Sequence, residues 1–183
     1  GKGECYGFEF FVQQKLVKNL FYVLSYTYVR STFSGTDGKL IASSWDNTHL
    51  LSGTLGYKFK KNWQIGLKYR FSGGLPYTPF DLVASQQNYL LLGTGTFDYP
   101  RLNQNRLRSF NQLDFRLDKK YNYKHTSLDL FIDIQNVFVF YQESPPSYTF
   151  QRNSDNTDFA TKDGNPVKPD GSNAIPVIPV SYT

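Results

Sequence analysis

Charged side chains at alternating positions are the groups in this sequence that offer the most chemistry. They stand two or four residues apart within three segments: Lys68, Arg70, Asp114, Arg116, Asp129 and Asp133. Such spacing places side chains on one face of a β-strand, and neighbouring strands would bring opposite charges together as cross-strand pairs. The set either forms a ladder that holds the strands in register or lines a path for a ligand or an ion.

Aromatic residues gather in the long segment from Gly73 to Ser109, which is rich in turn-forming residues. They are Tyr77, Phe80, Tyr89, Phe97 and Tyr99. Loops on a rigid scaffold commonly carry recognition, and aromatic rings stack on sugars or on chelates. The same rings could instead pack one loop against another, so the sequence leaves both interpretations open.

The sequence offers little support for a metal site or for catalysis. The segments NSDNTD (153–158) and KDGNPVKPDGSN (162–173) offer oxygen ligands for calcium, but they lack EF-hand spacing, which favours plain turns. His49 and His125 are the two histidines and lack the spacing of metal ligands. The glycines of GTGTFD (93–98) lack the strand and helix that flank a phosphate loop. The sequence therefore predicts neither an enzyme nor a resident metal or cofactor.

Composition narrows the class of protein. The 183 residues suffice for one domain, and 17% of them are aromatic, while the mean hydropathy is −0.48. No run approaches the roughly 18–20 consecutive apolar residues of a membrane helix. Strands that show lipid only their alternate residues would keep the average polar. The net charge of +5 is scattered, without the basic stripe that binds nucleic acid. Cys5, the single cysteine, cannot form an internal disulfide.

The elements that must position these groups are β-strands. Six segments alternate apolar and polar residues: 4–14, 20–30, 49–60, 62–74, 111–118 and 127–135. Their length of roughly ten residues is what a tilted strand needs to cross a bilayer core. Short basic connections alternate with long ones: 15–19, 60–62 and 119–124 are short, whereas 31–48, 73–109 and the part after Phe140 are long. This pattern predicts an all-β antiparallel up-and-down meander of the kind found in transmembrane β-barrels.

The two faces of the segment NWQIGLKYRFSGG (62–74) differ in chemistry. The apolar face carries Trp63, Ile65, Leu67, Tyr69 and Phe71. Rings near both ends of the strand fit the aromatic girdles of a membrane barrel, so we expect this face to meet lipid. The opposite face, with Lys68 and Arg70, is expected to meet the lumen together with Asp114, Arg116, Asp129 and Asp133 of later strands. A soluble β-sandwich binding module, whose strands alternate in the same way, is an alternative.

Three segments carry a family resemblance: SWDNTHLLSGTLGYKF (44–59), NWQIGLKYRFSGGLPYTPFD (62–81) and FNQLDFRLDKKYNYKHTSLDLFIDIQNVF (110–138). They resemble the C-terminal barrel strands of TonB-dependent outer-membrane receptors, particularly those of Bacteroidetes-type bacteria, and IQNVF (134–138) is similar to the strand that is usually next to last. The resemblance covers nearly the whole chain. It implies a barrel of about 22 strands in the bacterial outer membrane, filled by a plug that a TonB complex pulls on.

By this resemblance, the protein would bind a siderophore, haem, cobalamin or glycan at its outer loops and import it to the periplasm. About six strands cannot close such a barrel, and their open edges need pairing. We therefore expect the chain to be the C-terminal part of a larger receptor, without its plug and, since it ends at Thr183, without its closing strand. Its partners would be outer-membrane lipid, the rest of the barrel and the plug, the TonB complex through that plug, and a surface lipoprotein of the kind that serves some relatives. A passive porin or a structural outer-membrane barrel is the second alternative.

Overall fold

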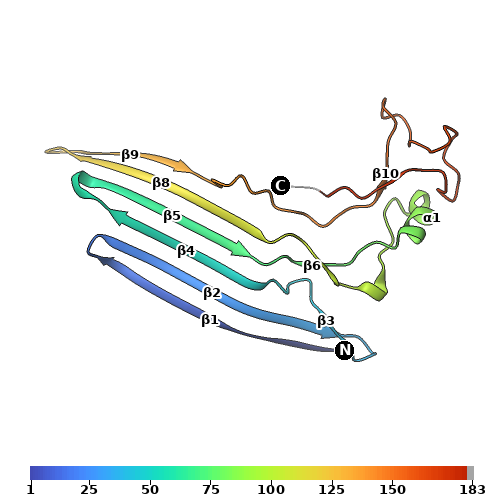
Figure 1. Ribbon diagram of the computed structural model, residues 1–183, viewed down its shortest axis with the longest axis horizontal. Helices are drawn as coiled ribbons and strands as arrows, with labels where there is room; N and C mark the ends of the chain where they lie inside the picture. The colour runs from blue at the N-terminus through green and yellow to red at the C-terminus, as the bar shows by residue number, and fades with distance from the viewer. Residues whose placement is uncertain (181–183) are drawn as a thin grey trace.

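An antiparallel meander dominates the computed structural model, which describes residues 1–180 (Figure 1). Its long strands are β1 (Lys2–Val17), β2 (Leu20–Ser34), β4 (Thr48–Lys58), β5 (Trp63–Ser72), β8 (Phe110–Asn122) and β9 (Ser127–Ile134). They pair in the order β1-β2-β4-β5-β8-β9, and the short β3 (Leu40–Ala42) pairs with the end of β2. The six predicted strands are thus confirmed. Within residues 1–180, β1 and β9 each pair on one side, so the sheet is open.

Tight turns lie together at one end of the sheet (Figure 1, left). Lys18 and Asn19 join β1 to β2 with φ of 48° and 70°, as a two-residue hairpin of type I′ requires. The 3-10 turn η1 (Lys60–Asn62) joins β4 to β5. The turn between β8 and β9 closes on a hydrogen bond from the Tyr123 amide to the Thr126 carbonyl, 2.8 Å long. This turn is shorter than the predicted connection at 119–124, because β8 continues to Asn122.

One face of the sheet is apolar from edge to edge. The register places Tyr22, Leu55, Leu67, Phe115 and Ile134 directly opposite one another across five strands. Large side chains on this face are exposed: Phe8, Phe10, Leu55, Leu130 and Ile132 among them. Within the described part of the chain, the buried hydrophobic residues all lie outside the long strands. The apolar face therefore belongs to a sheet that has no packed core of its own.

The long connections fold together beyond the other end of the sheet (Figure 1, right). The connection from β5 to β8 contains β6 (Pro76–Tyr77), helix α1 (Leu82–Leu92), the 3-10 turn η2 (Tyr99–Arg101) and β7 (Asn105–Arg106). The segment after β9 contains β10 (Thr149–Phe150) and β11 (Pro176–Val177). β6 pairs with β7 and β10 with β11. We call residues 75–107 and 145–177 the loop module.

Helix α1 interrupts a segment that the sequence pattern predicts to be loop. The Asp81 side chain caps it by accepting hydrogen bonds from the Val83 and Ala84 amides, both 3.0 Å long, and Gly93 ends it at a φ of 68°. Its apolar residues are spread around the helix instead of following one face, so the helical period is missing. Among the described residues, no helix combines the length and the apolar character needed to span a membrane. The prediction that the closing strand is absent falls on the end of the chain. Residues 181–183 lie outside the described residues, so it stays a prediction.

Candidate functional site

The charged residues of β5 and β8 share the face of the sheet opposite Leu67. Lys68 stands directly across from Asp114 and Arg70 across from Gln112. Arg70 Nη2 donates to Gln112 Oε1 at 2.7 Å and lies 4.0 Å from Asp114 Oδ2. Asp114 Oδ1 also accepts hydrogen bonds from Gln112 Nε2 and from the Asn136 amide, at 2.8 and 2.9 Å. The Asp114 carboxylate thus joins β5, β8 and the residues that follow β9.

A second charged group connects β8 to β9 on the same face. Arg116 donates to Asp118 over 2.8–3.1 Å, and its Nη1 lies 3.9 Å from Asp133 Oδ2 across the strand pair. The guanidinium also lies over the Phe131 ring, 4.2 Å from its centroid, where a cation is attracted to the ring face. The arginine is therefore held from three sides, and its charge is balanced by two carboxylates.

These charges surround a shallow hollow of about 280 Å³ on the sheet, which Lys68, Asp114, Arg116, Asp118 and Asp133 line. A further pair, Lys120 Nζ with Asp129 Oδ2 at 3.7 Å, lies closer to the tight-turn end of the sheet than the pairs above. The expected opposite-charge pairs across strands are therefore present. Exposed pairs contribute only about 0–1 kcal/mol each, so their main structural effect is to fix register. Their assignment to a lumen stays a prediction.

Three of the predicted loop aromatics take part in aromatic packing within the loop module. Phe80 is 7% exposed and stacks on Phe97 with ring centroids 5.0 Å apart. Tyr89 lies 4.5 Å from the Phe150 ring, and its hydroxyl is 2.8 Å from Thr149 Oγ1. Phe80 and Tyr89 therefore fit the loop-packing interpretation, and they are not free to stack on a ligand.

Tyr77, Tyr99 and the outer face of Phe97 remain accessible. Tyr77 and Phe97 line a hollow of about 370 Å³, and Tyr99 is 68% exposed. The core partners Tyr148 and Phe150 could not be predicted, because the segment after Phe140 shows no strand period. Burial raises the pKa of the Tyr148 hydroxyl, and Tyr89 nearby adds to the effect.

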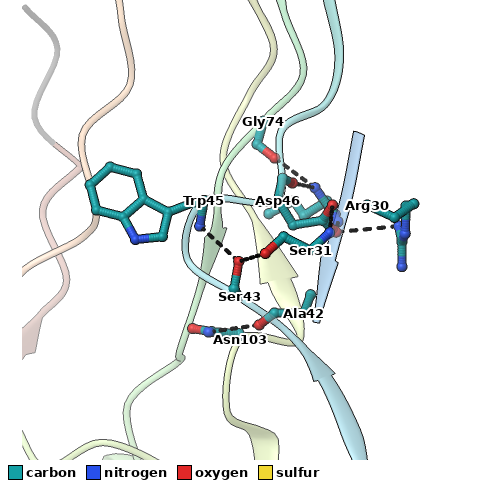
Figure 2. Close-up of polar contacts among 9 residues, drawn as sticks. Arg30, Ser31, Ala42, Ser43, Trp45, Asp46, Gly74 and Asn103 are labelled. Carbon is teal, nitrogen blue, oxygen red and sulfur yellow. Dashed lines mark hydrogen bonds and ion pairs between the residues drawn. The ribbon is translucent and has the colours of Figure 1, made fainter. Parts of the chain in front are cut away.

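A buried carboxylate that no sequence pattern reveals joins the loop module to the sheet (Figure 2). Asp46 is fully buried. Its Oδ2 lies 2.6 Å from Arg106 Nη2 and 3.3 Å from Arg30 Nη1, and its Oδ1 accepts from the Ser31 amide at 3.3 Å. Arg106 Nη1 donates to the Asp46 and Gly74 carbonyls at 2.6 and 2.9 Å. We call these five residues the Asp46 junction.

The residues before Asp46 are fixed by smaller polar contacts. Ser43 Oγ donates to Ser31 Oγ at 2.9 Å and accepts from the Trp45 amide at 3.3 Å. Asn103 Nδ2 donates to the Ala42 carbonyl at 2.9 Å. The Trp45 ring projects away from Asp46 (Figure 2) and is 83% exposed. The backbone is thus held in place while the largest side chain of the loop is presented outward.

Residues 161–174 of the loop module contain two aspartates whose pKa is lowered. The buried Asn173 amide donates to Asp163 Oδ1 at 3.0 Å, and the Asn165 amide donates to the same atom at 3.2 Å. These hydrogen bonds, first of all the one from Asn173, lower the pKa of Asp163 below its ordinary value because they favour the charged form. A hydrogen bond from the Ser172 amide lowers the pKa of Asp170 in the same way.

We expect the segment around Asp163 to loosen in acid. A lowered pKa in the folded state stabilises that state above the ordinary aspartate pKa, and the stabilisation is lost as the pH falls through the lowered value. Hydrogen exchange of residues 161–174, expressed as protection relative to the intrinsic exchange rate at each pH and followed from neutral pH downward, measures this opening. Asp163→Asn should flatten part of the pH dependence and leave the share of Asp170, whereas Asp155→Asn, at an exposed position nearby, should leave the profile unchanged. Identical profiles for Asp163→Asn and the parent would contradict the assignment.

Neither a metal site nor a relative adds further residues to this set. Among residues 1–180, no group of three or more histidine, cysteine, aspartate or glutamate side chains could hold a metal ion. No family model, curated protein or solved structure matches the chain. The candidate site therefore consists of the charged face, the loop module and the Asp46 junction that connects them.

Proposed function

We propose that this chain is part of a TonB-dependent receptor of the bacterial outer membrane, which binds its ligand at outer loops and imports it to the periplasm. One observation carries the proposal: the sheet has long strands, an apolar face that runs across all of them, and no packed core on that face. In water, an exposed apolar surface of this kind would strongly favour association with other molecules. In a bilayer the same surface is solvated by lipid.

The ends of the apolar face support this placement. At the tight-turn end, Lys119 Nζ lies 5.0 Å from the centroids of both the Trp63 and Tyr121 rings and donates to the Lys61 carbonyl at 2.6 Å. Aromatic rings beside a cation are typical of a membrane interface, where the apolar part of the ring contacts lipid tails and the charge contacts water and headgroups. At the other end, the Tyr69 hydroxyl donates to Asn111 Oδ1 at 2.8 Å. Both rims thus join apolar rings to polar groups.

The remaining parts have roles that follow from this placement. The charged face with Asp114 and Arg116 would line the lumen and contact the plug. The loop module would stand outside the cell and meet the ligand first. The open edges β1 and β9 would pair with further strands of the same barrel, because unpaired strand edges invite association.

The two alternatives differ from the proposal in specific observations. A soluble sandwich needs a second sheet on the apolar face, and the described residues pack none there. A passive porin shares the sheet and the lipid face, so it differs by the absence of a plug domain in the complete protein.

The intact mass and location of the native polypeptide test the proposal. We expect it in the outer-membrane fraction, released only by detergent, with a mass several times 21.1 kDa, since a barrel of about 22 strands needs that length. A plug domain in the complete protein would separate a receptor from a porin. A native mass near 21 kDa in a protein that stays monodisperse without detergent would overturn the proposal.

A further inference from the structure

A lysine lies on the apolar face of the sheet, at its tight-turn end. Lys119 follows Phe115 and Leu117 at alternate positions of β8 and lies directly across from Trp63, the first residue of β5. A lysine on a lipid-facing surface is least destabilising near the end of a strand, where its ammonium reaches the interface. The position of Lys119 therefore fits the edge of a bilayer, where its charge can meet a negative group.

Two aromatic rings and a carbonyl hold the side chain of Lys119 in place. Its Nζ lies 5.0 Å from the centroids of both the Trp63 and Tyr121 rings and donates to the Lys61 carbonyl at 2.6 Å. An ammonium has three N–H donors, and this carbonyl takes one of them. The ion pairs found among residues 1–180 do not include Lys119. The group of Trp63, Lys119 and Tyr121, which we call the rim lysine site, thus presents an oriented positive charge.

Other cations of the sheet are neutralised within the protein. Arg30 shares the apolar face at the loop end, where its Nη1 lies 3.3 Å from the buried Asp46 carboxylate. Lys120, the next residue along β8, lies on the charged face and pairs with Asp129 at 3.7 Å. The cross-strand neighbours of Lys119 are Trp63 and Leu130, both in the described sheet. Further strands of a barrel would pair with β1 and β9, so a partner for Lys119 would come from the side of the lipid.

Further lysines lie at the tight-turn end of the sheet (Figure 1, left). Lys18 belongs to the first turn, Lys60 and Lys61 belong to η1, and Lys124 belongs to the turn after β8. All four are exposed, and the ion pairs among the described residues include none of them. One lysine near an anionic membrane surface strengthens the attraction to it by a factor of about five. The turns therefore add positive charge around the rim lysine site.

We propose that the rim lysine site binds the phosphate of an anionic phospholipid. The phosphate would accept charge-assisted hydrogen bonds from Lys119 Nζ, and the acyl chains would lie along the apolar face, which begins beside the site at Ile65 and Leu117. A zwitterionic phospholipid carries its own cation next to the phosphate, so it gains less from the lysines of the turns. A free phosphate ion gains nothing from the apolar face. The inference rests on the proposed function, because it requires a bilayer, and it names one class of lipid as a partner.

The test uses the complete protein, purified in an uncharged detergent, stripped of lipid and shown to be folded by circular dichroism. Phosphatidylglycerol and phosphatidylcholine with the same acyl chains are added in equal amounts, and native mass spectrometry gives the ratio in which the protein retains them. We expect the parent to retain phosphatidylglycerol preferentially. Lys119→Gln should lower this preference by about fivefold, the contribution of one lysine. Lys119→Arg, which keeps the charge, should preserve most of the preference.

Lys120→Gln is the matched control, since it removes the same charge one residue further along β8, on the opposite face. Its preference should equal that of the parent, and inorganic phosphate should not displace the lipid from either protein. Equal retention of the two lipids by the parent, an unchanged ratio in Lys119→Gln, equal losses in both glutamine variants, or displacement by inorganic phosphate would overturn the inference. Those outcomes in an outer-membrane protein would leave the transport function standing. A protein that is absent from the outer membrane would refute the function itself, whatever lipid it binds.

Discussion

Replacing Leu67 by lysine is expected, under the proposed outer-membrane placement, to destabilise the protein by about 2–4 kcal/mol in a lipid bilayer, the cost of a lysine at the depth of the bilayer midplane. Leu67 lies in the middle of β5, opposite Leu55 and Phe115 on the apolar face. A lysine there would place its ammonium among aliphatic and aromatic side chains, far from either end of the strand. The free energy of unfolding in urea, measured in lipid vesicles, gives the size of the effect. The amount of protein that reaches the outer membrane should fall with it.

Leu20→Lys is the matched control, because it makes the same exchange on the same face. Leu20 begins β2 next to the Lys18–Asn19 turn and pairs with Tyr57. At that end a lysine can extend toward water, so the expected loss falls to about 0–1 kcal/mol. This dependence on depth is a signature of lipid. Equal losses at both positions, or no loss at Leu67, would contradict the assignment of lipid to the apolar face.

Replacing Asp46 by alanine should release the loop module from the sheet. Breaking a fully buried ion pair costs about 3–5 kcal/mol. The side chains of Arg30 and Arg106 are 33% and 35% exposed and can recover part of their hydration, so we expect the lower value of about 2–3 kcal/mol. The effect should be local, since the strand ladders do not depend on Asp46. Hydrogen exchange of residues 74–78 and 103–107 should speed up accordingly.

Asp37→Ala tests whether any lost carboxylate near β3 has this effect. Asp37 is exposed and accepts one hydrogen bond, from the Lys39 amide at 3.2 Å, so its loss should leave the exchange rates of the loop module unchanged. Asp46→Asn, which keeps an acceptor oxygen, should fall between the two. Rates in Asp46→Ala that match the parent would show that the junction does not hold the module.

The sheet could be predicted from the sequence because each strand and each tight turn shows its pattern within a short stretch of residues. Apolar and polar side chains alternate in each strand, and three tight turns connect strands that are adjacent in the chain. The pairs of Arg70 with Asp114 and of Arg116 with Asp133 followed from the same alternation, since strands that share an apolar face must also share the charged one. Which solvent meets each face stays a prediction.

The loop module could not be predicted because its contacts join distant segments. Asp46 meets Arg106 across 60 positions of the chain, and no local pattern links the two. Helix α1 had usable signals in Asp81 and Gly93, at the positions of an N-cap and a C-terminal glycine, but it lacks the apolar stripe that usually reveals a helix. Phe80 and Tyr89 stand out in the sequence as loop aromatics, but their packing partners Tyr148 and Phe150 lie after β9, in a segment without a strand period.

The contact between the two halves of the loop module affects how the edge of the sheet frays. Gln86 Nε2 donates to the Gly171 carbonyl at 2.9 Å, and these residues lie on opposite sides of β8 and β9 in the chain. The hairpin of β8 and β9 is therefore part of a closed ring of chain, with a turn at one end and the loop module at the other. If β9 detaches from β8, both of its ends remain tethered, which keeps its effective concentration beside the vacated edge high. The tether therefore favours re-pairing with β8 over capture of the exposed edge by another molecule.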